Sequence, residues 1–276
     1  MNPTLIIIHK EIRDGLRNRW VLAVAILLAM LALTLGFLGS APTGSVKVDP
    51  LTVTVVSLSS LSIFLVPLIA LLLSYDAIVG DIDRGTMALL LSYPVARWQV
   101  MAGKFCGHLT ILALATVAGY GTAGVALQLL HGGLDPDSWV PFGLLIAASI
   151  LLGACFLSVG YLVSALVRER ATAAGIAIGV WLFLVVIFDT AVLGILVVDQ
   201  GRIITAPLLN LILLFNPTDV YRLLNLTGHE NIAMFAGMAG LSGQATLSTG
   251  VLLLALGLWI ALPLSLAALV FNRRAL

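Results

Sequence analysis

Three residues near position 230 combine side-chain types and spacing that could bind a soft metal ion. They are His229, Met234 and Met238, and a helix would place the two methionines, which are four residues apart, on one face. Imidazole and thioether groups suit copper, but methionine is also an ordinary filler of apolar interfaces. We favour the second interpretation, so the sequence predicts a contact with a partner protein here and no metal site.

Asp189 is the one ionisable residue well inside an apolar run. Such a residue suggests a functional site by default. A helix from Ala171 to Asp189 rises about 27 Å, against a hydrocarbon core of roughly 30 Å, so the carboxylate should lie near the outer edge and reach interfacial water. A single acid also leaves the spans without the paired acids or histidine cluster that an intramembrane enzyme needs.

Two short sequences resemble parts of nucleotide-binding motifs but lack what that chemistry needs. Before Gly103-Lys104 the chain has Trp98 where a phosphate loop requires glycine, and Phe105 replaces the Ser or Thr that follows the lysine. Residues 241–244, Leu-Ser-Gly-Gln, have no Walker motif upstream. We therefore expect no cofactor bound directly to this chain.

Composition assigns the chain to the membrane. Of its 276 residues, 61% are hydrophobic and only 10% are charged, and the mean hydropathy is +1.13, whereas a soluble domain has about a quarter charged residues. The net charge of +1 gives no reason to expect a nucleic-acid partner. Cys106 and Cys155 lie in apolar segments and indicate neither a disulfide framework nor a metal motif. The predicted class is an all-α polytopic membrane protein surrounded by lipid.

Six stretches supply the roughly 20 apolar residues that a span needs. They are Trp20–Gly39, Leu51–Ser74, Val100–Leu130, Val140–Val167, Ala171–Val198 and Thr249–Phe271. We expect residues 1–276 to form a single transmembrane domain.

The N-terminal residues and the charge distribution predict an orientation. Residues 1–18 combine apolar residues at helical spacing with a basic side, which predicts an amphipathic helix on the membrane surface; a basic flank that only fixes orientation is the alternative. With the N-terminus inside, all but Lys47, Arg202 and Arg222 of the 14 Lys and Arg residues are cytoplasmic. The positive-inside rule then puts both termini in the cytoplasm.

Residues 199–248 form the one large segment predicted outside the membrane, before the last span. Ile203–Phe215 is apolar but too short to span, and Asn216-Pro217-Thr218 predicts a helix start with Thr218 as N-cap. We expect this periplasmic segment to contact an accessory protein through Thr218, Tyr221, Arg222, His229, Met234 and Met238.

The densest polar patch inside a span is Ser57, Ser59, Ser60 and Ser62. Polar groups can line a path, and small polar residues also allow close helix packing, so this patch and Asp189 are candidates for either role. The spans supply no ring of charge for a hydrated metal channel. We favour a bundle that transmits movement over one that passes a small sulfur-containing or apolar compound.

The charged stretch at residues 75–104 organises the chain, because it joins two spans and carries a short helical pattern. Thr86 is a candidate N-cap, Leu89–Leu91 follow, and Pro94 ends the run. Gly85 predicts a backbone geometry that a side chain would hinder. The pattern predicts a helix parallel to the membrane that another protein can bind.

The motif in that stretch resembles the first cytoplasmic loop of type-2 ABC transporter permeases. The chain has acid-x-acid-Arg-Gly-Thr at 81–86, Leu-Leu-Leu-Ser-x-Pro-Val-x-Arg at 89–97 and Gly-Lys at 103–104. The family usually has Glu at the position of Asp81. In that family the loop is the coupling helix that docks on the ATPase subunit, and an elbow helix precedes the first span. The resemblance covers the whole chain in length and span pattern, and the order of elements is most similar to the permeases that serve nitrous oxide reductase maturation.

The resemblance implies two copies of this chain with two ATPase subunits, which hold ATP and Mg, in a bacterial inner membrane. It assigns ATPase coupling to the 81–98 loop and to the connector between the fourth and fifth spans. The residues concerned are Asp81, Asp83, Arg84, Gly85, Thr86, Leu90, Pro94, Arg97, Arg168, Glu169 and Arg170.

The implied role is non-catalytic. The chain would couple ATP hydrolysis to export, or to signalling toward a periplasmic partner in the maturation of the copper–sulfur centres of nitrous oxide reductase. One alternative is a general type-2 exporter of a small or hydrophobic compound. The other is an ATP-independent carrier or a membrane enzyme, for which the coupling motif would have no use.

Overall fold

The computed structural model describes residues 3–17, 20–39, 50–131, 139–199, 205–226 and 247–274, and every regular element in these ranges is helical. The elements are α1 (Pro3–Arg17), α2 (Trp20–Gly39), α3 (Pro50–Ser74), α4 (Val79–Asp83), α5 (Thr86–Leu91), α6 (Arg97–His131), α7 (Trp139–Leu166), α8 (Arg170–Leu182), η2 (Phe183–Ile187), α9 (Phe188–Asp199), α10 (Ala206–Leu214), α11 (Pro217–Leu226) and α13 (Thr249–Arg273).

Among these residues, five helical stretches are long and apolar enough to cross a membrane, and six if α1 and α2, bent by 65°, count as one span. The five are Val55–Asp83, Arg97–Leu129, Trp139–Leu166, Arg170–Asp199 and Thr249–Arg273. The predicted all-helical, multi-pass class is confirmed, with five to six spans where the sequence predicts six.

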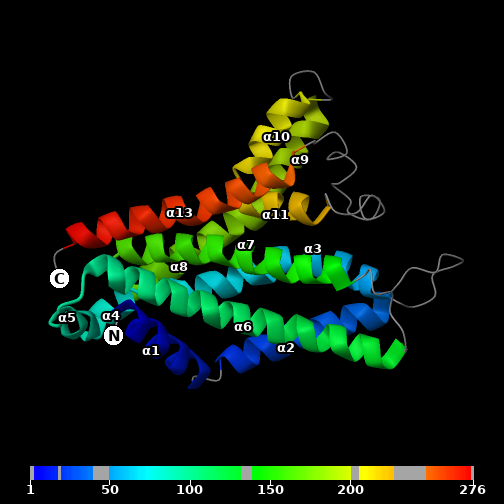
Figure 1. Cartoon of the computed structure of the whole chain (residues 1–276). Helices are drawn as coiled ribbons and strands as arrows, with labels where there is room; N and C mark the ends of the chain where they lie inside the picture. Colours follow the sequence, from blue (N-terminus) through cyan, green and yellow to red (C-terminus); the bar gives the residue numbers. More distant parts are fainter. Residues whose placement is uncertain are drawn as a thin grey trace, which may run out of the picture.

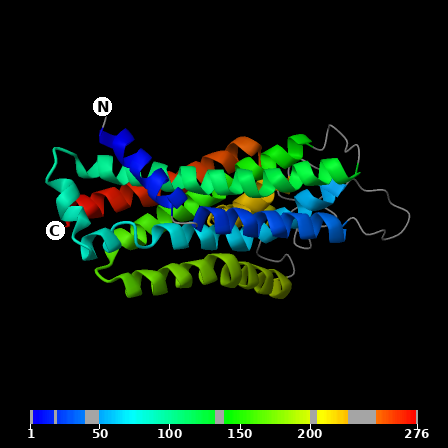
Figure 2. The same cartoon turned by 90° about the horizontal axis from the view of Figure 1, so that it is seen from below.

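The long helices lie side by side, with α7 at the centre of the bundle (Figures 1 and 2). α3 and α13 pack along α7, while α2 packs along α6. α1 crosses the N-terminal half of α6. α4, α5 and the C-terminal end of α13 lie at the same end of the molecule (Figure 1). α8, η2 and α9 follow one another along the side of the bundle (Figure 2), and only 17% of the most apolar part of this stretch is buried, compared with 61% for α7.

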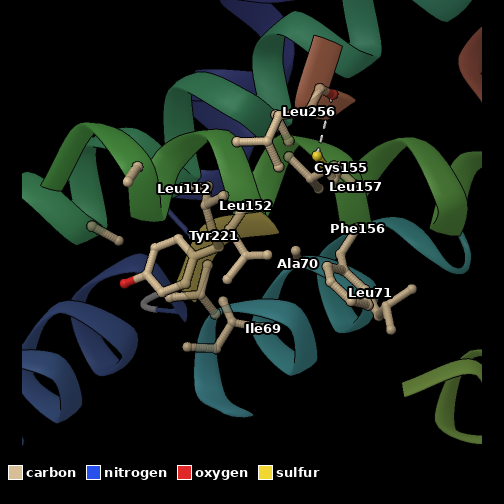
Figure 3. Close-up of a cluster of buried hydrophobic side chains, with 14 of the residues drawn as sticks. Ile69, Ala70, Leu71, Leu112, Leu152, Cys155, Phe156, Leu157, Tyr221 and Leu256 are labelled. Carbon is tan, nitrogen blue, oxygen red and sulfur yellow. Dashed lines mark hydrogen bonds between the residues drawn. The ribbon is translucent and has the colours of Figure 1, made fainter. Parts of the chain in front are cut away.

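The segment predicted to lie outside the membrane folds partly back into the bundle. α11 packs against α13, α7 and α3, and Figure 3 shows Tyr221 of α11 among Ile69, Leu112 and Leu152. Tyr221 is fully buried, and its hydroxyl forms a hydrogen bond with that of Ser149 at 3.1 Å. This helix is therefore part of the core.

Two predicted helix caps are wrong by one or two residues. α5 begins at Thr86, so the cap position is occupied by the residue before it, Gly85. Gly85 has φ of 72°, in the left-handed region that favours glycine, so the predicted backbone geometry is confirmed. α11 begins at Pro217, and the Asn216 Oδ1 accepts hydrogen bonds from the Thr218 N–H at 3.1 Å and hydroxyl at 2.8 Å. Asn216 is the cap because asparagine is as good a cap as threonine and proline suits the first helical position.

Candidate coupling site at the α4–α5 end

The charged loop folds into two short helices that meet at Gly85, and a set of hydrogen bonds closes the turn. The Thr86 hydroxyl donates to the Asp81 carbonyl oxygen at 3.1 Å and to its Oδ1 at 3.0 Å. The Arg84 guanidinium donates to the same Oδ1 at 2.8 Å, and this contact raises the pKa of Arg84. Asp81 thus fixes α4 and α5 relative to each other.

The neighbouring spans hold α4 in place. The Ser164 hydroxyl of α7 accepts hydrogen bonds from the backbone N–H groups of Ile78 and Val79, at 3.0 and 3.1 Å. These groups lie at the start of α4, where the backbone has no partner of its own within the helix. Asp76 forms ion pairs with Arg170 of α8 at 2.8 Å and with Arg84 at 3.8 Å. α7 and α8 are therefore both tied to the charged loop.

A buried lysine links the loop to the N-terminal helix. Lys104 of α6 is 4% exposed, and its Nζ lies 2.7 Å from the Asp81 Oδ2 and 3.0 Å from the Glu11 Oε1 of α1. Two charge-assisted hydrogen bonds compensate the desolvation of this ammonium group. Lys104 thus joins α1, α6 and α4 in one network.

The network continues into the bundle through a histidine. The His108 Nε2 lies 3.6 Å from the Glu11 Oε2. The His108 Nδ1 and the Tyr161 hydroxyl of α7 form a hydrogen bond of 2.8 Å. Tyr161 also packs edge-on against Phe105. The carboxylate of Glu11 is therefore connected through one imidazole to the central helix.

Glycines in α6 allow α1 to come this close. A Cβ added at Gly103 would lie 2.9 Å from the Ile7 Cβ, and one added at Gly107 would lie 2.6 Å from the Glu11 Cβ. Both distances are shorter than side chains tolerate. The spacing of four residues puts both glycines on the face of α6 that α1 crosses.

Arg97 is used within the chain, at the end of the last helix. Its guanidinium donates to the carbonyl oxygens of Phe271 at 2.7 Å, Asn272 at 3.1 Å and Arg274 at 2.7 Å. It also lies over the Phe271 ring, 5.6 Å from its centre. A cation at a helix C-terminus satisfies carbonyl groups that lack partners. Arg97 therefore fastens α13 to the start of α6, and its predicted docking role stays a prediction.

The outer face of this end is apolar and exposed. Leu89 is 67% exposed, Tyr93 65% and Trp98 58%, while Met87 on the inner side of α5 is buried. We call Leu89, Tyr93 and Trp98 the α5 patch. Exposed apolar patches are typical of surfaces that contact another protein or a membrane.

The other residues predicted for coupling lie around this patch or beside it. Asp83 and Pro94 are exposed, and Leu90 is half-buried beneath the α5 patch. Arg168 and Glu169 are exposed in the predicted short connector, and Arg170 begins α8. The structure brings both predicted regions to one end of the molecule.

The serines of α3 point in different directions. Ser62 is buried, and its hydroxyl lies 2.6 Å from that of Tyr120 in α6. Ser60 is exposed and donates to the carbonyl of Val56 in its own helix at 3.2 Å. Ser57 and Ser59 are half-buried. The Ser62 contact joins two helices, as the packing interpretation expects.

Asp189 and the predicted partner-contact residues differ most from expectation. The Asp189 Oδ2 forms an ion pair with the Arg222 Nη2 at 2.6 Å, so its carboxylate has a protein partner where the sequence predicts interfacial water. Thr218 and Tyr221 are fully buried within the chain and offer no surface to an accessory protein. His229, Met234 and Met238 lie outside the described residues.

Sequence reasoning missed several members of the network. The predicted site residues do not include five members of the network, and four of these lie in or beside apolar segments. The five are Glu11, Asp76, His108, Tyr161 and Ser164. One usable signal is that Glu11 lies four residues after Ile7, on the apolar side of α1. The Gly103/Gly107 pair is another, because it predicts close approach of a second helix.

Comparison with known proteins yields one family and two close relatives. The model of the ABC-2 family transporter proteins matches residues 5–276. The chain is 45% identical over 276 residues to the probable ABC transporter permease protein NosY of Stutzerimonas stutzeri, covering 99% of each chain. It is 46% identical over 269 residues to the protein of the same name from Pseudomonas aeruginosa PAO1, covering 97% of each chain.

Proposed function

Because this chain belongs to the ABC-2 transporter family, we propose that two copies of it form a complex with two ATPase subunits and respond to ATP hydrolysis through the α4–α5 end. As a permease it is the non-catalytic membrane subunit. We place the α4–α5 end in the cytoplasm, as the charge distribution favours. We place the chain in a bacterial inner membrane because of its resemblance to bacterial permeases.

The α5 patch carries this proposal. Its three side chains are exposed on the loop between two spans, where an apolar surface needs a protein partner. Directly behind it, Asp81 is held by Arg84 and Lys104. A force on α5 therefore reaches α1, α6 and α8 through ion pairs rather than being absorbed by a flexible loop.

The test removes one apolar contact without disturbing the network. Leu89→Ser changes a side chain that is 67% exposed. Leu129→Ser is the matched control, because Leu129 is 78% exposed and lies near the C-terminal end of α6, far from α5. We expect Leu89→Ser to lose the ATPase subunit during copurification while the control retains it. Equal recovery of the ATPase with both variants would contradict the docking role of the patch.

We propose that the second copy packs on α8 and α9. This stretch is the least buried of the five long spans, and a Cβ added at Gly175, Gly179 or Gly194 would meet nothing within 4 Å. Small residues on an open face allow two membrane helices to approach closely. Cysteine at Gly179 should cross-link between copies, and failure of several positions along α8 and α9 to do so would contradict this interface.

Orientation can be tested at two exposed residues. In a background without Cys106 and Cys155, cysteine at Ser92 should be protected from an impermeant thiol reagent added outside the cell. Cysteine at Thr249, which begins α13, should react. Reaction of both from outside would contradict the proposed topology.

The bundle supports transmission of movement better than passage of an ion. In the described part of the chain, no group of three His, Cys, Asp or Glu residues could hold a metal ion. The hydroxyls of Ser62 and Ser158 bond to other helices rather than facing an aqueous path. We therefore propose that the complex acts on a periplasmic partner. From the sequence resemblance, we place this role in maturation of the copper–sulfur centres of nitrous oxide reductase.

Spin labels can separate the two modes. Because Thr218 is buried, the exposed Thr249 is the better position for a label. With ATP bound and hydrolysis blocked, the distance between labels in the two copies should change, and vesicles should take up no copper in response to ATP. Unchanged distances together with ATP-dependent copper uptake would contradict transmission.

One observation favours the alternative, export of a small hydrophobic compound. An apolar groove of ≈ 520 Å³ lies among α7, α8, η2 and α13, lined by residues that include Gly179, Trp259 and Pro263. Gly179→Leu would fill part of it. If the variant keeps its ATPase coupling but blocks ATP-dependent export of an apolar fluorescent dye, the alternative gains support.

A further inference from the structure

Two aspartates share one arginine where α11 meets the α9 part of the span Arg170–Asp199. The Arg222 Nη2 lies 2.6 Å from the Asp189 Oδ2 of α9, and its Nη1 lies 2.7 Å from the Asp219 Oδ1 of α11. Both carboxyl groups therefore lie against the same guanidinium. The second oxygen of Asp189, Oδ1, is buried and accepts no hydrogen bond from the described residues.

A second contact fixes the same junction. η2 is a π-helical segment, in which the backbone hydrogen-bond spacing is widened. The Asn216 Nδ2 donates to the Leu184 carbonyl oxygen in this segment at 2.8 Å, while its Oδ1 caps α11. The cap of α11 is thus bonded to η2, and the charged cluster lies just beyond this contact, on α11 and at the start of α9.

Among the described residues around this cluster, carboxyl groups outnumber cations. α3, α7, α10 and η2, which pack around α11, carry no Asp, Glu, Lys, Arg or His in their described residues, and the only such residue on α13 is Arg273, at the far end. α9 adds Asp199, at the end of the helix away from Asp189. Tyr221, the other titratable group of α11, bonds to Ser149. Two carboxylates therefore face one guanidinium in a largely apolar environment.

We propose that Asp189 and Asp219 bind one proton between them beside Arg222, forming a proton-binding site that fastens α11 to the span Arg170–Asp199. The proton is held as an O–H group on Asp219 that donates to the unsatisfied oxygen of Asp189. This arrangement leaves one carboxylate and one guanidinium, so the buried charges cancel, and it gives every oxygen a partner.

Burial and the nearby carboxylate of Asp189 support this assignment, because together they raise the pKa of Asp219 to about 7, despite the opposing charge of Arg222. Since this pKa is raised in the folded state, the folded chain holds the proton where the unfolded chain would have lost it. The stabilisation is therefore complete below about pH 4, falls as the pH rises, and is lost near pH 7.

Infrared difference spectroscopy of the purified complex measures this proton directly. A protonated carboxyl C=O band should disappear with a midpoint near pH 7, and Asp219→Asn should lack that band. Asp189→Asn should move the midpoint down, because it removes a like charge. Arg222→Gln should move it up, because it removes the opposing cation. Asp14→Asn, which changes an exposed acid of α1, is the control and should leave the midpoint unchanged.

Opposite shifts in Asp189→Asn and Arg222→Gln keep the test decisive even if Asp219→Asn fails to fold. A purely structural arginine–aspartate pair would show no carboxyl band that titrates near neutral pH. Absence of that band in the unsubstituted protein, or its persistence in Asp219→Asn, would overturn the proposal. Midpoint shifts of the same sign in the other two variants would overturn it as well.

Discussion

Replacing Lys104 with methionine should destabilise the protein strongly, because it leaves two buried carboxylates without their shared cation. Lys104 Nζ contacts Asp81 at 2.7 Å and Glu11 at 3.0 Å, and its side chain is 5% exposed. Removing one partner of a buried ion pair costs about 3–5 kcal/mol. The lower end applies here, because Asp81 keeps Arg84 and Glu11 keeps Lys10.

That cost converts into a measurable shift in melting temperature. With about 2–4 °C lost per kcal/mol in a protein of this size, roughly 3 kcal/mol lowers Tm by about 6–12 °C. Lys10→Met is the matched control, because Lys10 contacts the same Glu11 oxygen at 3.2 Å but is 58% exposed. An exposed ion pair contributes about 0–1 kcal/mol, so this variant should lose at most a few degrees.

Thermal unfolding in detergent, followed by tryptophan fluorescence, is a suitable assay. The double variant Lys104→Met/Glu11→Gln should recover part of the loss, because one of the two uncompensated charges is gone. Equal Tm values for Lys104→Met and Lys10→Met would refute the reasoning, since burial would then make no difference. A double variant less stable than Lys104→Met would refute the assignment of the cost to the uncompensated carboxylate charges.

Three further predictions concern backbone geometry at helix contacts. Gly103→Ala should lower stability by about 1–3 kcal/mol, because its Cβ would lie 2.9 Å from that of Ile7. Gly121→Ala is the control: its Cβ would meet nothing within 4 Å, so its melting temperature should be unchanged or higher. Gly85→Val should cost about 1–3 kcal/mol through its φ of 72°, and we expect it to reduce ATPase copurification, so normal recovery would contradict a role for the turn. Asn216→Ala should cost about 1 kcal/mol through loss of the α11 cap, and an unchanged Tm would show that the cap contributes nothing.

The sequence predicts the class of fold well because hydrophobicity is a local property. Each apolar run of sufficient length becomes a helix, and the short connector before Arg170 and the turn at Gly85 follow from the residues themselves. What the sequence could not predict is which spans are neighbours. The pairing of Lys104 with Glu11 joins residues 93 positions apart, and no local pattern contains that information.

The misplaced caps and partners have the same origin. Thr218 and Asn216 are both acceptable caps from sequence alone, and in the structure Asn216 caps α11 while its amide group also bonds to η2. The family resemblance implies that Arg97 takes part in docking, and no local pattern shows that the end of α13 lies within its reach. The depth of Asp189 along its span predicts contact with interfacial water, and its partner Arg222 is 33 positions away in the chain.

The proposed transmission of movement depends on how α7 connects the two ends of the molecule. Ser164 of α7 holds α4, and Ser149 of α7 holds Tyr221 of α11; the 15 residues between the two serines span roughly 22 Å of helix. α7 is the most buried of the long helices, so it can move as a rigid unit but cannot bend easily. A displacement of α4 that shifts α7 would therefore displace α11 as well. Because Arg222 also binds Asp189 on α9, such a displacement must either carry α9 with it or separate that ion pair.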